Sequence, residues 1–393
     1  MTMPLEGIKV LDLSRVIAGP FCTQLLADYG AEVIKVEDRQ GGDPSRQQQP
    51  LINGTGSLFY LVNRNKKSLA LDLKQEEGKE VLRRLVREAD VLIEQFRPGV
   101  MDKLGLGYKD LNAENPRLIY CSLSGYGQTG PMSVAPSHDL NFQSLAGMAL
   151  LNGRPEEIPL VPPLTFMAMA GGSLYAMAAI MMALFQRNKT GEGQYCDVAI
   201  LDGSVSMTAS LLADWAGSGN LPRRGEGRLA GGFACYNIYA TGDGGYISLA
   251  AVESKFWKEF CEGIGYPEFA DAQWDPVQQE AIRMAVQDYF LTRPRQEWEK
   301  LFENSDICFS PLLDLDEMCQ HPQVTAREMI TRLHDFVSPG RDLCLTGLPV
   351  KLSASPGQVI PEFAALGEHS EEIIRQLGYS EEELKRLRER GVI

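Results

Sequence analysis

The sequence predicts an α/β fold in which a parallel sheet comes first and a smaller α+β domain follows. Short apolar runs recur along the first third of the chain, and helical patterns separate them. Parallel strands need crossover connections, which helices usually supply. Beyond the Gly- and Arg-rich stretch 217–232 the pattern changes to short strands around a Gly turn, and then to helices. That stretch is expected to be an exposed connection or a loop over a site.

The strands and helices of the first half are expected at regular intervals. Strand patterns span 7–14, 31–37, 68–73, 90–96 and 117–124. A helix opens at Gly19–Pro20, because proline suits the first turn of a helix. A charged amphipathic helix is expected over 76–88. The first strand is followed by SRVIAGP, which has one glycine where a dinucleotide fingerprint needs three, so no nicotinamide cofactor is expected.

The second half is expected to contain a smaller domain and a helical C-terminus. Short strands within 233–251 flank the turn 242–245, and helical segments follow. We take 225–325 as the small α+β domain.

At the C-terminus, Ser380 and Glu383 form a capping-box pattern. Ser370 is expected to cap the preceding short helix, which Gly378 ends.

Composition argues against several kinds of partner and site. The formal net charge of −14 would repel a long polyanion, so nucleic acid is not an expected partner. The eight cysteines form no CxxC pair and only four histidines are present, so we expect no metal site. Scattered cysteines and an N-terminus without a signal-peptide pattern suggest a cytoplasmic protein. The apolar run 166–185 is long enough to cross a membrane, but we interpret it as a buried core helix, with no membrane partner.

Several motifs together resemble one family, the family III coenzyme A transferases, also called the CaiB/BaiF family. They are VLDLSRVIAGPFCTQLLADYGAEVIKVE at the start, NRNKKSLALDL at 63–73, FRPGVMDKLGLGY at 96–108, SLSGYGQTGP at 122–131, RNKTGEGQYCDVAILDG at 187–203 and SPLLDLDEM at 310–318. The family includes the α-methylacyl-CoA racemases. The resemblance covers nearly the whole chain, with the motifs in the expected order, although no single motif would establish it.

The resemblance implies an architecture. A large Rossmann-like, CoA-binding domain would be built from both ends of the chain, residues 1–215 and 326–393, beside the small domain. Two chains would thread through each other as interlocked rings. Each active site would lie between the large domain of one subunit and the small domain of the other.

The resemblance also implies which residues bind coenzyme A, a substrate with a pyrophosphate and a 3′-phosphate that need cations. The candidates are Arg39, Lys74, Arg97 and Lys103 for the phosphates, Gln95, Phe96 and Leu104 along the path, and Val16 and Ala18 beside the pantetheine. The alternative is that the lysines and arginines are ordinary surface charges. The methionines Met167, Met169, Met177, Met181 and Met182 either line an acyl pocket or pack in the core.

Three further candidates concern proton transfer. Racemases of the family have a histidine at the position of His138, followed by the aspartate that is Asp139 here. A pKa near neutrality suits histidine for moving the proton next to a thioester. Glu253 resembles the acid that assists that histidine. The alternatives are that His138 caps a helix beginning near Asp139, and that Glu253 is an exposed loop carboxylate.

The family's catalytic aspartate is missing. Between Glu157 and Glu192 there is no Asp or Glu, and alignment by the flanking motifs places either Ala168 or Met169 at its position. In a transferase this carboxylate attacks the acyl-CoA thioester, and in a racemase it carries a proton. A methyl group or a thioether can do neither.

Two classes of function are therefore open. The chain could be the subunit of a heteromeric CoA-transferase that lacks the aspartate, with a paralogous partner supplying it, as in benzylsuccinate CoA-transferase with its two related subunits. Such an enzyme would move CoA between an acyl-CoA such as succinyl-CoA and a carboxylic acid, as a heterodimer or heterotetramer. Alternatively, a homodimer would be a racemase-like isomerase using His138, an engineered Asp-to-Ala inactive variant, or an acyl-CoA-binding protein without catalysis.

Overall fold

The computed structural model describes residues 2–163 and 165–393 and divides the chain into two compact units. Unit 1 contains Met1–Ala146, Pro163–Thr208 and Pro322–Ile393. Unit 2 contains Gly147–Pro162 and Ala209–His321. Each unit is described by itself below.

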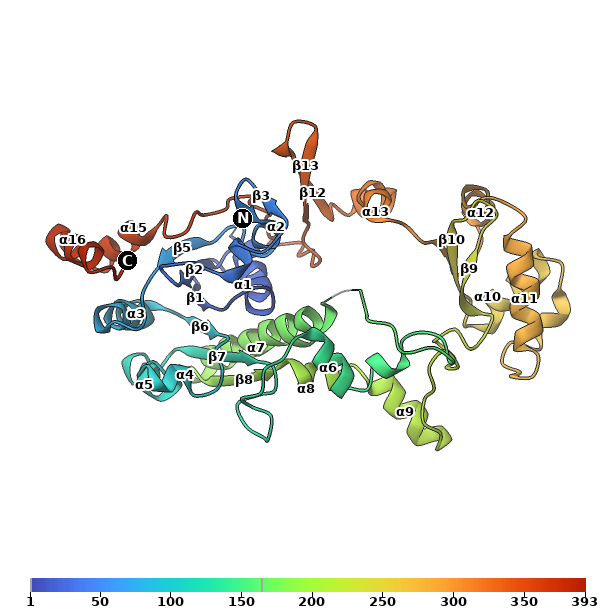
Figure 1. The fold of residues 1–393 in the computed structure, drawn as a ribbon, viewed down its shortest axis with the longest axis horizontal. Coiled ribbons are helices and arrows are strands. Elements are labelled where there is room, and N and C mark those ends of the chain that lie inside the picture. Colours follow the sequence, from blue (N-terminus) through green and yellow to red (C-terminus); the bar gives the residue numbers. More distant parts are fainter. Residues whose placement is uncertain (1, 164) are drawn as a thin grey trace. The chain divides into compact units, whose positions relative to one another are not determined.

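Unit 1 is built on a six-stranded sheet of order β5-β2-β1-β6-β7-β8, in which every pairing is parallel (Figure 1). The strands are β1 Lys9–Leu13, β2 Glu32–Glu37, β5 Lys67–Ala70, β6 Val91–Glu94, β7 Ile119–Ser124 and β8 Tyr195–Ala199. The predicted parallel α/β sheet is confirmed, and each of the five predicted strands overlaps one of these, with β5 beginning one residue before its predicted range. Sequence patterns alone did not indicate β8, because only Val198 and Ala199 at its end are buried.

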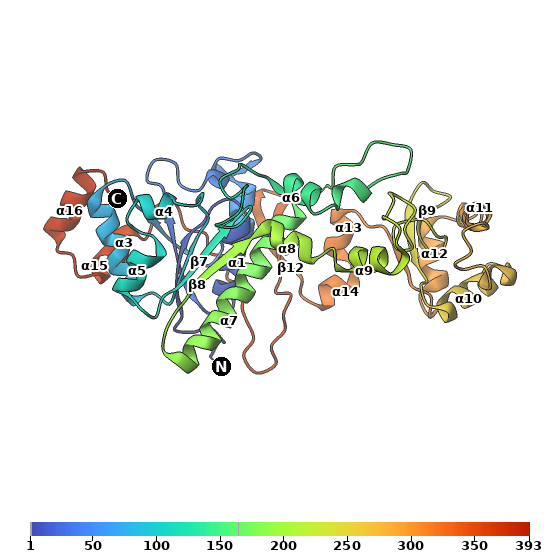
Figure 2. The same ribbon diagram turned by 90° about the horizontal axis from the view of Figure 1, so that it is seen from below.

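Helices cover both faces of this sheet. One face is packed by α1 Ala18–Asp28 and α7 Leu174–Thr190, and α7 runs along β7 and β8 (Figure 2). The other face is packed by α3 Glu76–Glu88, α5 Tyr108–Glu114, α15 Ser370–Gln376 and α16 Glu381–Glu389. The apolar core on that second face joins strand residues such as Leu11 and Leu92 to helix residues such as Val81 and Ile373.

Local sequence explains where several helices begin. Helix α3 has the predicted bounds, with Val81, Leu82, Leu85 and Val86 on one buried face. The Ser380–Glu383 capping box at the start of α16 is confirmed. The predicted cap at Ser370 is wrong: His369 precedes α15, and the Ser370 hydroxyl instead accepts the Ala70 N–H of the edge strand at 3.1 Å.

The apolar run after residue 165 forms two kinds of helix. A π-helical segment spans Ala168–Ser173, and α7 follows directly. The interpretation as a buried core helix holds for one face of α7: the small and aliphatic residues Ala176, Ile180 and Ala183 are buried, while Met182 and Phe185 on other faces are exposed. By length and composition the helix Ala168–Thr190 could cross a membrane, and half of its most apolar window is buried within the protein. A helix that packs with one side on a sheet is expected to be about half buried in this way.

The remaining elements of unit 1 are short. They are the 3₁₀ turn Pro44–Arg46, β3 Leu51–Ile52, β4 Thr55–Gly56, α2 Ser57–Val62, α4 Val100–Lys103, α6 Asp139–Leu145, α8 Ile200–Ser206, α14 Pro322–Ala326, and the hairpin of β12 Ile330–Ser338 and β13 Arg341–Thr346. The π-helical segment and α8 approach closely, since a Cβ placed on Gly203 would lie 2.0 Å from the carbonyl oxygen of Gly171.

Unit 2 has a three-stranded antiparallel sheet of order β11-β10-β9. Its elements are the 3₁₀ turn Ala149–Leu151, α9 Ala209–Ser218, β9 Tyr236–Ala240, β10 Tyr246–Ala250, α10 Ser254–Gly263, the 3₁₀ turn Pro267–Ala270, α11 Gln279–Phe290, α12 Arg295–Phe302, β11 Phe309–Pro311 and α13 Leu315–Gln320. One face of the sheet packs on the helices around Trp257, Phe290 and Trp298.

Candidate functional site

A cavity of about 280 Å³ lies at the carboxyl edge of the parallel sheet. The strand order corresponds to 3-2-1-4-5-6 of a doubly wound fold, in which ligands bind where the order reverses, between the first and fourth strands. Those strands are β1 and β6 here. The cavity is lined by residues at or just after the ends of four neighbouring strands, Leu13, Ser14, Arg15, Val36, Glu37, Asp38, Gly42, Asp43, Leu71, Asp72, Leu73, Lys74, Phe96, Val100 and Leu104.

Six of the nine predicted CoA-binding residues lie in or beside this cavity. Lys74, Phe96 and Leu104 line it. Val16 lies in the loop that joins β1 to α1, and Ala18 is the first residue of α1. The Gln95 side-chain oxygen accepts the Gly19 N–H at the start of α1 at 3.3 Å.

The other three predicted residues are more scattered. Arg39 is exposed two residues beyond β2, and its Nε donates to the carbonyl oxygen of Ile393 at 3.1 Å. Lys103 is exposed at the end of α4. Arg97 lines a different cavity from its neighbour Phe96, so consecutive residues of FRPG line different cavities.

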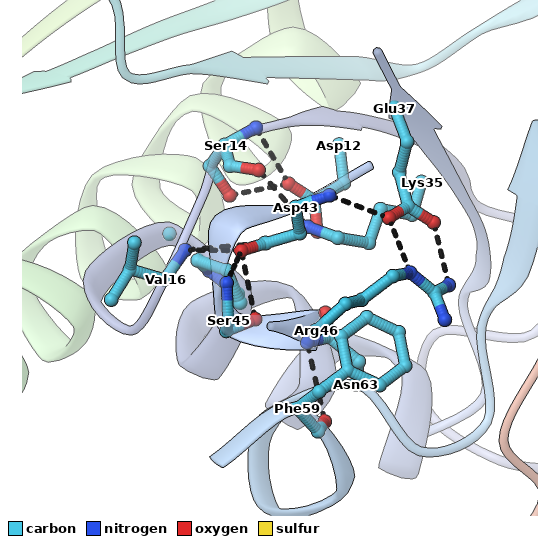
Figure 3. Close-up of polar contacts among 12 residues, drawn as sticks. Asp12, Ser14, Val16, Lys35, Glu37, Asp43, Ser45, Arg46, Phe59 and Asn63 are labelled. Carbon is cyan, nitrogen blue, oxygen red and sulfur yellow. Dashed lines mark hydrogen bonds and ion pairs between the residues drawn. The ribbon is translucent and has the colours of Figure 1, made fainter. Parts of the chain in front are cut away.

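A buried cluster of charges lies beneath the CoA-binding candidates, and sequence reasoning missed it (Figure 3). Lys35 of β2 is 1% exposed, and its Nζ lies 2.9 Å from Asp43 Oδ2 and 3.9 Å from Asp12 Oδ2. Asp12 is also 3.0 Å from the Nζ of Lys66. The sequence did contain a signal for this cluster, because each of two apolar strand patterns includes a charged residue: Asp12 in VLDL and Lys35 in VIKV.

A second ion pair extends the cluster. Glu37 at the end of β2 accepts two hydrogen bonds of 2.8 Å from the guanidinium of Arg46 and one of 2.7 Å from the Ser68 hydroxyl. The Arg46 guanidinium also lies over the Phe59 ring at 3.7 Å. Glu37 is therefore neutralised within the protein, although it lines the cavity.

Burial and pairing shift several pKa values in this cluster. Burial opposes the ionised form of Asp12, but Lys35 and Lys66 outweigh it and hold the pKa of Asp12 well below its usual range. Burial likewise opposes ionisation of Asp43, and Lys35 again keeps its pKa low. For Lys66, burial prevails over the attraction of Asp12 and lowers the pKa to about 8. The carboxylates are charged at neutral pH, as the fixed counter-ions of buried lysines must be.

Two of the three predicted proton-transfer residues, His138 and Asp139, are neighbours at the start of α6. His138 is exposed and precedes the helix as its N-cap, and its N–H is accepted by the Asn141 side-chain oxygen at 2.9 Å. Asp139 is buried. Its Oδ1 accepts the Ala168 N–H at 2.6 Å, and its Oδ2 accepts from the Gln143 amide at 2.6 Å.

This hydrogen bond brings Asp139, the residue after His138, to Ala168, which lies 29 residues further along the chain. The Ala168 backbone begins the π-helical segment, and its methyl group is buried. Met169 is only partly buried. Because a methyl group has no proton or lone pair to use, the side chain at position 168 can neither attack a carbonyl nor transfer a proton.

Glu253 belongs to unit 2, where it is the exposed N-cap of α10. Its predicted role beside His138 stays a prediction, since His138 belongs to unit 1. Over residues 2–163 and 165–393, no group of three or more His, Cys, Asp or Glu side chains could hold a metal ion.

A second cavity of unit 1, of about 540 Å³, was not indicated by the sequence. Its lining includes Glu94 at the end of β6, with Tyr120 and Ser122 from β7 and Tyr195 from β8. Burial raises the pKa of Glu94 to about 7, although hydrogen bonds from Ser122 and from the Phe96 N–H favour the ionised form. Glu94 lines this cavity and also accepts a hydrogen bond from the backbone of Phe96, which lines the cavity of about 280 Å³.

Comparisons with known proteins agree with this geometry. A family model described as CoA-transferase family III matches residues 5–370. The chain is 36% identical over 403 residues to a human α-methylacyl-CoA racemase, covering 100% of this chain and 98% of the relative. It is 33% identical over 401 residues to the succinyl-CoA–L-malate CoA-transferase beta subunit of Chloroflexus aurantiacus, covering 100% and 98%.

Among solved structures, a CaiB/BaiF family protein from Brucella suis superposes with a TM-score of 0.84 at 30% identity. The match covers 96% of this chain and 100% of that one. On the family match and these full-length similarities, the chain belongs to CoA-transferase family III.

Proposed function

We propose that this chain binds acyl-CoA at the carboxyl edge of the six-stranded sheet and acts in a family III CoA-transferase as the subunit without the catalytic aspartate. The reaction is CoA transfer between an acyl-CoA such as succinyl-CoA and a carboxylic acid. The observation that carries the proposal is the methyl group of Ala168, buried beside the His138–Asp139 turn.

The cavity at the sheet edge fits a nucleotide-containing acyl carrier. Val36, Leu71 and Leu104 offer an apolar surface, and Phe96 offers an aromatic ring on which an adenine can stack. Arg15 and Lys74 supply cations at the rim for phosphate groups. Because Lys35 and Arg46 neutralise the nearest buried carboxylates, the cluster beneath the cavity does not repel an anionic ligand.

A partner chain completes the proposal. In interlocked family dimers each active site is shared between two chains, so a paralogous subunit can bring the missing carboxylate to a site that this chain helps to shape. A relative named as a beta subunit supports pairing of unlike chains within the family. In a homodimer both sites would lack the carboxylate.

A second function is favoured by one observation, the retained His138 at the N-terminus of α6 in a chain that is 36% identical to a racemase. In that function His138 removes and returns the proton next to the thioester carbonyl, and another acid takes the place of the missing aspartate. Glu253 stays a candidate for the assisting acid. Cytoplasmic location and the absence of a membrane partner stay predictions.

The test uses the purified chain and two matched variants, with CoA transfer from succinyl-CoA to L-malate as the readout. We expect the natural chain to be inactive alone and Ala168→Asp to gain activity by at least about a hundredfold, the scale associated with a missing nucleophile. Met169→Asp, one residue away, should gain nothing. Rapid transfer by the unaltered chain alone would overturn the subunit assignment.

A second assay separates the isomerase. An α-methylacyl-CoA is incubated with the unaltered chain in deuterated water, and deuterium at the α carbon is measured by mass spectrometry. The transferase-subunit proposal expects no exchange. Exchange that His138→Ala abolishes would establish the isomerase instead.

A further inference from the structure

The loop between β1 and α1 contains a strained residue. Val16 has a φ of +66°, in the left-handed region that favours glycine. A β-branched side chain disfavours that region strongly, so such a residue persists only where its surroundings hold it. Val16 follows Ser14 and Arg15, which line the cavity at the sheet edge.

The surroundings that hold Val16 are identifiable. Both carboxylate oxygens of Asp43 accept the Val16 N–H, each at 3.1 Å (Figure 3). The N–H and hydroxyl of Ser45 each donate to Asp43 Oδ1 at 2.8 Å, which fixes the orientation of the carboxylate. The Nζ of Lys35 pairs with Asp43 at 2.9 Å and donates to the Ser14 carbonyl at 2.9 Å. The same lysine therefore also holds the first residue of the loop between β1 and α1.

The anchor is buried and electrically balanced. Asp43 is 2% exposed and sits in the turn that follows β2, not on the loop that it holds. Asp12 and Glu37 face Lys35 from β1 and β2, and Lys66 also pairs with Asp12. Since its partners Lys35 and Ser45 are buried too, Asp43 can leave the loop only by breaking a buried ion pair.

We propose that Asp43 is a positioning residue for CoA binding: anchored by Lys35, it holds Val16 in the left-handed conformation that shapes the loop bordering the cavity. The inference rests on the proposed CoA-binding function of that cavity. Asp43 acts through the backbone of Val16. Without its carboxylate, Val16 relaxes to negative φ and the loop loses the shape that admits the ligand.

The test measures CoA affinity by calorimetry and melting temperature by scanning fluorimetry. Asp43→Ala should weaken CoA binding by about tenfold or more, the equilibrium factor that corresponds to backbone strain of this kind. Adding Val16→Gly to Asp43→Ala should raise the CoA affinity again by about threefold or more, because glycine adopts positive φ almost as readily as negative φ. The melting temperature should stay low in the double variant, since the ion pair with Lys35 is still missing.

Asp28→Ala is the matched control. Asp28 is also fully buried and paired with a buried cation, Arg64 at 2.7 Å, but it does not line the cavity. It should lower the melting temperature and leave the CoA affinity unchanged. If it weakens CoA binding as much as Asp43→Ala, the effect is general destabilisation and the inference is wrong.

Two single variants test the idea even if Asp43→Ala does not fold. Val16→Pro removes the N–H and forbids positive φ, so it should weaken CoA binding by about tenfold or more. Val16→Ala keeps the N–H that Asp43 accepts, so it should weaken CoA binding less than Val16→Pro does. If Val16→Pro binds CoA as tightly as the unaltered chain, the inference about Asp43 is wrong, but the proposed CoA-binding function still stands. Failure of the unaltered chain to bind CoA would overturn the proposed function together with the inference.

Discussion

Replacing Lys35 by methionine should destabilise the part of the parallel sheet formed by β1 and β2 far more than an equivalent change at an exposed ion pair. The substitution keeps most of the length of the side chain and removes its charge. It deletes a contact of 2.9 Å to Asp43, a longer one of 3.9 Å to Asp12, and the hydrogen bond to Ser14. Asp43 is then left buried without a cation.

The magnitude follows from burial. Removing one partner of a buried pair costs about 3–5 kcal/mol, because the remaining charge stays desolvated. Asp12 keeps Lys66 at 3.0 Å, so we expect the lower end of that range. The matched control is Lys67→Met on β5. Lys67 is also 2.9 Å from a carboxylate, Glu32, but the two side chains are 32% and 41% exposed, which limits the loss to about 0–1 kcal/mol.

Hydrogen exchange is the appropriate assay. All four tryptophans, Trp215, Trp257, Trp274 and Trp298, belong to unit 2, so their fluorescence does not report on this sheet. A loss of about 3 kcal/mol lowers the protection of the slowest amides of β1 and β2 by about a hundredfold, at roughly 1.4 kcal/mol per factor of ten. Lys67→Met should lower it less than about fivefold.

The effect should also depend on pH. The pKa values of Asp12 and Asp43 are lowered by folding, so their pairing stabilises the protein above the unfolded pKa of about 3.9 and is lost as the pH falls through the folded values. Lys35→Met therefore costs most at neutral pH and less below about pH 4. Equal protection in the two lysine variants at pH 7 would refute the reasoning.

Three further predictions concern other parts of the chain. Because burial raises the pKa of Glu94 to about 7, well above its unfolded value of about 4.3, ionising it costs stability increasingly between those pH values, and Glu94→Gln should flatten that loss in pH-dependent urea unfolding. Gly203→Ala should lower the melting temperature sharply, since its Cβ would lie 2.0 Å from a backbone oxygen, while Gly217→Ala in open space should not; equal melting temperatures would contradict the close approach. Ser380→Ala should cost about 1 kcal/mol by removing a helix cap, visible as faster exchange in the C-terminal helix, and unchanged exchange would argue against the cap.

Much of the large unit was predictable from local patterns. Alternating buried strands and amphipathic helices indicated the parallel sheet, because burial on both faces requires continuous apolar runs. Helix α3 was predicted with its observed bounds, since its apolar residues repeat at helical spacing. The C-terminal capping box could be predicted from Ser380 and Glu383 by themselves, because these two residues contact each other three positions apart in the chain. Strand β8, with one buried end, gave no comparable signal.

The sequence by itself determined the alternation of strands and helices, the family motifs and the missing carboxylate at Ala168 or Met169, because these depend on residue type and near-neighbour spacing. Only the tertiary structure decided that Asp12, Lys35, Asp43 and Lys66 share one buried cluster, and that the Asp139 carboxylate bonds the Ala168 backbone. Ion pairs and hydrogen bonds depend on distances of a few ångströms between residues far apart in the chain, and local spacing carries no record of those distances.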